Sequence, residues 1–203
     1  MRARLALLRR QPIISIGLVA INVAVFLLCK NFGKLIYMGD LDPVRVLNYN
    51  EYGRILWSIF LHNGIDHLFN NMLILFFLGS MIENEVGHVR YAVLYFLSGI
   101  GGSLVSLYAK VVNNEFAASV GASGAIFGLD GALLAMVLFS DKRMENVTMP
   151  RVLLMITCSL YNGFVGGNID NAAHVGGLIT GFAAATAMCV FRRWRHRGNR
   201  YYK

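Results

Sequence analysis

Two short polar motifs, each at the start of a long apolar run, contain the residues best suited to chemistry. Residues 119–124 read Ser-Val-Gly-Ala-Ser-Gly and include Ser123, and residues 171–177 read Asn-Ala-Ala-His-Val-Gly-Gly and include His174. An ionisable residue inside an apolar helix is costly and by default indicates function. A serine hydroxyl becomes a nucleophile when an adjacent histidine accepts its proton. The two motifs therefore suggest acyl transfer at Ser123, provided that their helices meet.

The composition places both motifs in a membrane protein. The 203 residues have a mean hydropathy of +0.53 and are 56% hydrophobic but only 15% charged, whereas about 25% is usual in soluble domains. We expect one domain over residues 1–203. The net charge of +8 gathers at the two ends, where it flanks apolar runs, so it indicates membrane contact rather than nucleic-acid binding. The three cysteines lack metal-ligand spacing, and we expect neither a metal ion nor a cofactor.

Six segments approach the length of about 20 residues that crosses a bilayer as a helix. They are residues 13–29, 63–82, 90–111, 120–139, 150–168 and 172–191. The first is longer than a signal-peptide core and no Ala-x-Ala site follows it, so we expect an uncleaved span. Residues 30–62 mix polar and aromatic side chains, which is typical of a loop in the membrane interface. The predicted fold is an all-α, six-transmembrane-helix bundle with an interfacial first loop.

The positive-inside rule predicts the orientation. With both termini cytoplasmic, the two basic tails and the 140–149 loop lie inside, whereas the short outer loops, 112–119 and 169–171, contain no Lys or Arg. The first outer loop, with four basic residues, fits less well. The second, fourth and sixth spans then all run inward, so their polar starts share one depth. We therefore expect a site that opens to the outer face, where water can enter.

Further polar residues at this depth suit an oxyanion site. His67 and Asn71 are four residues apart on one helix face, and the helix start at Ser123 offers free backbone N–H groups. Asp170 precedes the last span and Asp130 lies two turns below Ser123, so neither is placed as a third catalytic member. A Ser-His dyad is favoured, and Asp130 is expected to be a structural, hydrogen-bonded residue or to tune the site.

Small residues recur at four-residue spacing in the two motif-bearing spans. The sequences Gly124-xxx-Gly128 and Gly177-xxx-Gly181 are small-xxx-small seams, which let membrane helices approach closely. They would bring Ser123 within hydrogen-bonding reach of His174. A third group of glycines at the outer end of the fifth span suits either a mobile gate or close packing: Gly163, Gly166 and Gly167.

The combination resembles the rhomboid family of intramembrane serine proteases, over about residues 54–191. The matching motifs are Gly121-Ala-Ser123-Gly124, His62…His67…Asn71, Ala-His174-Val-Gly-Gly and Gly79-xxx-Glu83-xxx-Gly87. The resemblance implies Ser123 as nucleophile and His174 as general base. It also implies an oxyanion hole formed by His67, Asn71 and the Ser123 backbone N–H, and a structural Glu83.

The resemblance further implies an endopeptidase that cleaves transmembrane or membrane-proximal segments of other membrane proteins through an acyl-enzyme. Its partners would be those substrates and the lipid bilayer, and its expected location is a bacterial cytoplasmic membrane. Two positions depart from the family pattern. Gly53 stands before Arg54 where the family often has tryptophan, and Phe127 replaces a common tyrosine. Phe127 can still stack on the histidine ring but has no hydroxyl.

Two other readings compete with a protease. A non-catalytic rhomboid-like protein that escorts membrane clients would normally lack the serine or the histidine, and both are present here. A small transporter that uses the histidines as a proton path predicts internal repeats and broken helices, and the sequence has no evident repeat. Ser123 alone would suit packing, and His174 alone a structural hydrogen bond. Their pairing at one depth favours catalysis.

Overall fold

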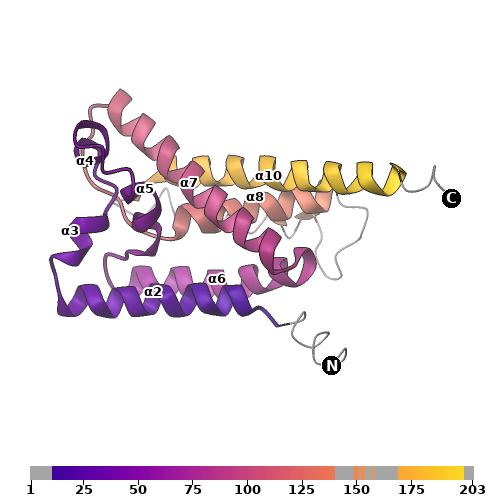
Figure 1. The fold of residues 1–203 in the computed structure, drawn as a ribbon, viewed down its shortest axis with the longest axis horizontal. Helices are drawn as coiled ribbons and strands as arrows, with labels where there is room; N and C mark the ends of the chain where they lie inside the picture. Colours follow the sequence, from indigo (N-terminus) through magenta and orange to yellow (C-terminus); the bar gives the residue numbers. More distant parts are fainter. Residues whose placement is uncertain (1–10, 140–148, 151, 154–156, 158–168, 199–203) are drawn as a thin grey trace.

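The computed structural model describes residues 11–139, 149–150, 152–153, 157 and 169–198, with side chains to residue 194. Over this part of the chain the secondary structure is helical, apart from one isolated antiparallel bridge between Leu41 and Ser119. Figure 1 shows the elements in chain order: α2 (Ile13–Asn31), α3 (Leu35–Gly39), α4 (Pro43–Asn48), α5 (Arg54–Trp57), the 3-10 helix η1 (Ser58–Phe60), α6 (Ile65–Val86), α7 (His88–Val112), α8 (Ser123–Phe139) and α10 (Asn171–Gly198).

Four helices in the described ranges are long and apolar enough to cross a membrane: α2, α6, α7 and the Asn171–Trp194 part of α10. They coincide with the predicted first, second, third and sixth spans. The predicted fourth span corresponds to α8, which is apolar but has only 17 residues. The predicted fifth span, with its three outer glycines, lies largely outside the described residues. The count of six spans therefore stays a prediction.

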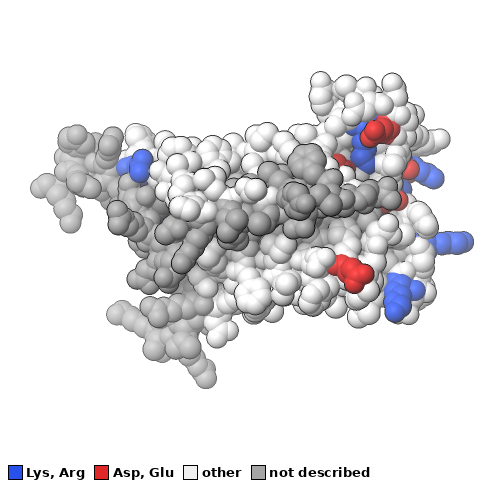
Figure 2. Space-filling view, turned by 180° about the vertical axis from the view of Figure 1, so that it is seen from behind, with Lys and Arg blue, Asp and Glu red and all other residues white. Residues whose placement is uncertain are grey.

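The long helices pack in two pairs that α7 links. Helix α2 packs along α6, α8 packs along α10, and α7 crosses between the pairs and contacts both (Figure 1). Figure 2 shows nearly all the visible charged side chains at the end of the molecule that carries α3, α4 and α5. Where the middle of this face is described, it shows few charged side chains (Figure 2), as a lipid-facing surface requires.

The contact between α8 and α10 depends on glycines, as the sequence predicted. A Cβ atom added to Gly177 would lie 1.9 Å from the carbonyl oxygen of Gly124, and one added to Gly181 would lie 1.9 Å from that of Gly128. No side chain fits at such distances, so the two backbones touch directly. This contact sets the separation between the start of α8 and the start of α10.

Replacing Gly181 with alanine should therefore push α10 away from α8. We expect a lower midpoint of thermal unfolding, because the new methyl group meets a backbone oxygen that cannot move alone. Gly17→Ala is the matched control, since a Cβ on this α2 glycine meets nothing within 4 Å. A Gly181→Ala protein that unfolds at the same temperature as Gly17→Ala would contradict the seam.

Glu83, near the end of α6, caps the start of α2. The first N–H groups of a helix have no partner within the helix. The Glu83 carboxylate accepts hydrogen bonds from the backbone N–H of Ile14 (2.9 Å) and Ser15 (2.8 Å) and from the Ser15 hydroxyl (2.6 Å). His88 Nδ1 lies 2.5 Å from the same carboxylate. These contacts give Glu83 a structural position, at the opposite end of α6 from His67.

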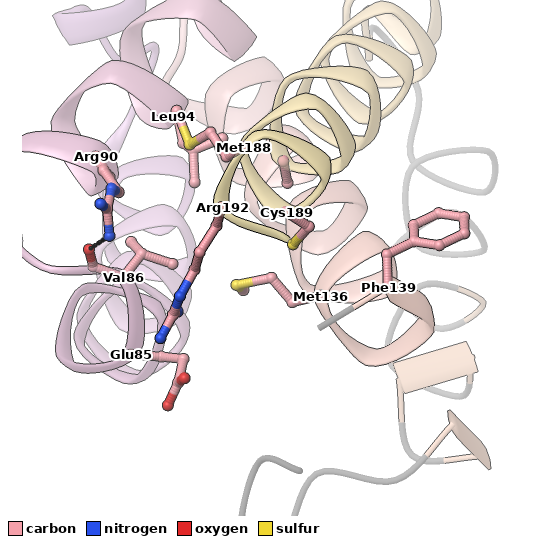
Figure 3. Close-up of a pocket in the computed structure, with 10 residues that line it drawn as sticks. Glu85, Val86, Arg90, Leu94, Met136, Phe139, Met188, Cys189 and Arg192 are labelled. Carbon is pink, nitrogen blue, oxygen red and sulfur yellow. Dashed lines mark hydrogen bonds between the residues drawn. The ribbon is translucent and has the colours of Figure 1, made fainter. Parts of the chain in front are cut away.

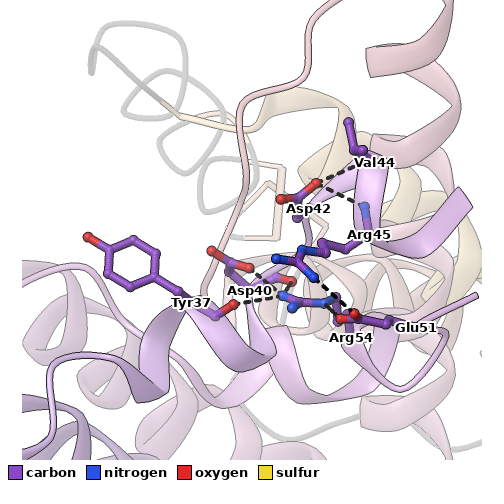
Figure 4. Close-up of polar contacts among 7 residues, drawn as sticks. All are labelled: Tyr37, Asp40, Asp42, Val44, Arg45, Glu51 and Arg54. Atoms are coloured by element: carbon purple, nitrogen blue, oxygen red, sulfur yellow. Dashed lines mark hydrogen bonds and ion pairs between the residues drawn. The ribbon is translucent and has the colours of Figure 1, made fainter. Parts of the chain in front are cut away.

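The predicted interfacial loop, residues 30–62, folds into α3, α4, α5 and η1 around a buried arginine (Figure 4). Arg54 is 6% exposed and pairs with Asp40 and Glu51, each at 2.6 Å. Its guanidinium also donates to the carbonyl oxygens of Tyr37 (3.1 Å) and Asp40 (3.0 Å). Arg54 therefore anchors the loop although Gly53 replaces the expected tryptophan. Whether this loop lies in the membrane interface stays a prediction.

Candidate active site

Ser123 and His174 lie in hydrogen-bonding contact. Ser123 is the first residue of α8, and His174 lies in the first turn of α10. Because the glycine seam holds the two helices together at these ends, Ser123 Oγ and His174 Nε2 are 2.9 Å apart. The histidine is 5% exposed. A serine and a histidine that are 51 positions apart in the sequence thus meet in a largely enclosed place.

Phe127, one turn after Ser123, fixes the plane of the histidine ring. The two rings stack with centroids 4.1 Å apart and an interplanar angle of 12°. The expectation that phenylalanine can stack here without the tyrosine hydroxyl is confirmed. When His174 Nε2 accepts the Ser123 proton, Nδ1 carries the other ring proton, and no described residue hydrogen-bonds to Nδ1. Within the described part of the chain, the ring is therefore oriented by stacking and by the backbone of α10, and no carboxylate there binds Nδ1.

Gly121 brings His67 against the serine. Its φ of +137° lies in a region that side chains disfavour. A Cβ atom at Gly121 would lie 2.8 Å from His67 Cε1, 2.9 Å from His67 Nε2 and 3.7 Å from Ser123 Oγ. Only glycine leaves room for this approach. The Gly121 N–H donates to the Ser58 carbonyl oxygen at 3.0 Å, which ties this turn to the first loop.

His62 and Asn71 complete the polar group around His67. The rings of His62 and His67 meet edge to face with centroids 5.1 Å apart. Burial, together with the neighbouring His67, lowers the pKa of His62 to about 4, so it is neutral at neutral pH. Asn71 follows His67 by one turn and is 6% exposed, and its Nδ2 has no hydrogen-bond partner among the described residues. A buried amide donor without a partner is costly. A bound substrate oxygen could supply the missing hydrogen-bond acceptor.

Asp170 is the nearest acid in sequence to His174, but its carboxylate binds other groups. It accepts hydrogen bonds from the hydroxyls of Ser106 and Ser119 and from the Ala173 backbone N–H, and Lys110 Nζ lies 3.6 Å away. Burial alone would raise the pKa of this carboxyl, but these hydrogen bonds and the Lys110 charge outweigh it and lower the pKa. Residue spacing in the sequence does not indicate this cluster, although an aspartate just before a helix is a recognised N-cap signal.

The remaining sites in the described residues offer less chemistry. No three His, Cys, Asp or Glu side chains of this part of the chain are grouped to hold a metal ion. A pocket near the end of α8 far from Ser123 is lined by Leu94, Met136 and Met188, with Arg90 and Arg192 beside it (Figure 3). Asp130 is 2% exposed on α8. Thr180 of α10 donates its hydroxyl proton to the Gly176 carbonyl oxygen at 2.8 Å.

Comparison with known proteins identifies the family of the chain. The sequence model of the Rhomboid domain matches residues 49–191, which cover most of the chain and all the site residues described above. The chain belongs to the rhomboid family. Rhomboid proteins are generally intramembrane serine proteases, and this member is an integral membrane protein.

Two curated relatives illustrate the breadth of the rhomboid family. The chain is 41% identical over 155 residues to RHOMBOID-like protein 4 of Arabidopsis thaliana, covering 75% of this chain and 38% of the relative. It is 34% identical over 184 residues to Rhomboid protease GluP of Bacillus subtilis (strain 168), covering 88% of this chain and 35% of the relative. The chain thus spans little more than a third of the length of these relatives.

These relatives do not support the expected bacterial origin. A plant rhomboid protein is at least as similar to the chain as the bacterial protease is. Membership of the family and the apolar helices establish an integral membrane protein. They do not establish which membrane it occupies, so the assignment to a bacterial cytoplasmic membrane is not retained.

Proposed function

We propose that this chain is an intramembrane serine endopeptidase that cleaves transmembrane or membrane-proximal segments of other membrane proteins. One observation carries the proposal: Ser123 Oγ lies 2.9 Å from His174 Nε2, where two apolar helices begin. That distance is within the range at which a base accepts the proton of a nucleophile. Membership of the rhomboid family supports the same chemistry.

In this proposal the reaction proceeds in two steps through an acyl-enzyme. Ser123 Oγ attacks the scissile carbonyl carbon while its proton passes to His174 Nε2. The imidazolium then gives that proton to the leaving amine as the peptide C–N bond breaks. In the second step His174 takes a proton from water, the hydroxide attacks the acyl carbon, and the proton returns to Ser123 as the carboxylic acid product leaves.

The developing oxyanion is stabilised by three donors in this account. They are the backbone N–H of Ser123 at the start of α8, the ring of His67, and Nδ2 of Asn71. The role of His67 is supported by its position against Gly121, beside the serine. The role of Asn71 is supported by its buried Nδ2, which has no hydrogen-bond partner among the described residues. Donors fixed before the reaction cost no reorganisation when charge develops.

A cleavage assay with purified protein tests the proposal. The chain in detergent or lipid nanodiscs is incubated with a panel of single-span membrane proteins, and the products are identified by mass spectrometry. We expect at least one substrate to be cut in or near its apolar segment by the parent and not by Ser123→Ala. Equal cleavage by the parent and by Ser123→Ala would contradict the proposed function. Binding of the panel without any cleavage would favour the non-catalytic alternative.

We also propose that both termini lie in the cytoplasm and that the site opens to the outer face. The basic tails support this orientation through the positive-inside rule. Starting from a chain without Cys29, Cys158 and Cys189, we expect Ser123→Cys to react with a membrane-impermeant thiol reagent added outside. Lys142→Cys, in the loop predicted to be cytoplasmic, should not react. The opposite labelling pattern would reverse the orientation.

A further inference from the structure

Asp170 lies where three segments of the fold meet. Its carboxylate accepts hydrogen bonds from Ser106 in α7, from Ser119 in the segment before α8, and from the backbone of Ala173 at the start of α10. Lys110 of α7 lies 3.6 Å from the carboxylate and also donates to the Ser119 hydroxyl. The Lys110 and Asp170 side chains are only 11% and 18% exposed, respectively.

The Asp170 cluster fixes the backbone of the first turn of α10, which contains His174. The Asp170 carbonyl oxygen accepts the hydrogen bond of the His174 backbone N–H at 3.2 Å. Its carboxylate accepts that of Ala173 at 3.0 Å. This is the N-cap arrangement, which fixes where the first turn of a helix begins. Any shift of Asp170 therefore moves the turn that carries His174.

The cluster also holds the chain that leads to the serine. Ser119 lies four residues before Ser123. Its hydroxyl donates a hydrogen bond to the Asp170 carboxylate at 2.5 Å. Its backbone pairs with Leu41 of the first loop, with N–O distances of 2.9 and 3.3 Å. The same carboxylate thus binds the chain on both sides of the Ser123–His174 hydrogen bond.

We propose that Asp170 is a positioning residue that sets the distance between Ser123 and His174. It acts through Ser119 and the cap of α10 and does not touch the reacting atoms. A buried ion pair contributes little net stability, because desolvation offsets the attraction, but it can select one geometry. Small errors in the placement of catalytic groups lower rates strongly. The inference rests on the proposed function, since it concerns the same two residues.

The test compares Asp170→Ala, Asp170→Asn and Ser119→Ala with Glu115→Gln. Glu115 is an exposed acid in the same segment, outside the cluster. For each protein we would measure kcat and KM on a substrate of the parent, thermal unfolding, and the rate at which a fluorophosphonate labels Ser123. The saturating extent of labelling gives the fraction of competent molecules, so rates can be expressed per competent site.

Asp170→Ala should lower kcat per competent site by about 10²-fold with little change in KM, and should slow labelling in parallel. Asparagine keeps an acceptor for the Ala173 N–H and hydrogen-bonding groups for the serines, so Asp170→Asn should recover most of the loss. Ser119→Ala leaves the α10 cap intact and should still lower kcat and the labelling rate. A loss confined to thermal unfolding, with per-site rates equal to those of Glu115→Gln, would overturn the inference. A parent that neither cleaves nor labels would instead defeat the proposed function.

Discussion

Replacing Ser123 with alanine should lower kcat by several orders of magnitude, on the order of 10⁶ for a nucleophile and base that act as a unit. His174→Ala should cost a similar factor, because His174 Nε2, 2.9 Å from Ser123 Oγ, is the base that accepts the serine proton in this mechanism. The double variant should be no slower than either single variant, since each removes the whole dyad. The measurement is single-turnover cleavage of a substrate identified with the parent protein.

A matched variant distinguishes lost chemistry from lost folding. Ser80 lies in the C-terminal half of α6, and its hydroxyl has no hydrogen-bond partner among the described residues. Ser80→Ala should therefore keep the parent rate and the parent thermal unfolding. A folded Ser123→Ala or His174→Ala protein that cleaves as fast as Ser80→Ala contradicts the dyad.

Replacing an oxyanion donor should have the next largest effect. Asn71→Ala or His67→Ala should lower kcat by about 10²–10³, as removal of one donor does in other oxyanion holes. The loss stays below that of the dyad variants, because the Ser123 backbone N–H remains in place. KM should change less than kcat, since the negative charge exists only in the transition state.

The chain supplies a close control for Asn71. Asn70 precedes it on α6 but is exposed, whereas Asn71 is 6% exposed. Asn70→Ala should leave kcat unchanged on several substrates. If Asn71→Ala behaves in the same way while folding normally, the amide does not stabilise the oxyanion, and the same criterion applies to His67→Ala.

The sequence allowed the central contacts of the site to be predicted because they follow from helix periodicity. Two small-xxx-small seams in two apolar runs allowed a close approach of α8 and α10. The structure confirms that approach, because a Cβ atom added to Gly177 or Gly181 would lie only 1.9 Å from a carbonyl oxygen of α8, and the Ser123–His174 distance follows from it. The stacking of Phe127 on His174 was predictable for the same reason, since residues one turn apart share a helix face.

The contacts of the first loop were not predictable, because they join residues with no regular spacing. Arg54 binds Asp40, 14 positions earlier, and the carbonyl oxygen of Tyr37, 17 positions earlier. The Asp170 cluster has the same character, since Ser106 and Ser119 are 64 and 51 positions away from it. Such contacts depend on how whole segments pack, which periodicity does not specify. The N-cap positions of Asp170 and of Asp42, which precedes α4, did have a local signal.

The proposed mechanism depends most directly on whether Ser123 is an activated nucleophile. Treating the purified protein with a fluorophosphonate and mapping the adduct by tandem mass spectrometry measures this without a known substrate. We expect one adduct, on Ser123, and none on Ser123 in His174→Ala, although the serine is still present there. An adduct on a different serine, or labelling of Ser123 at the parent rate without His174, would contradict the proposed mechanism.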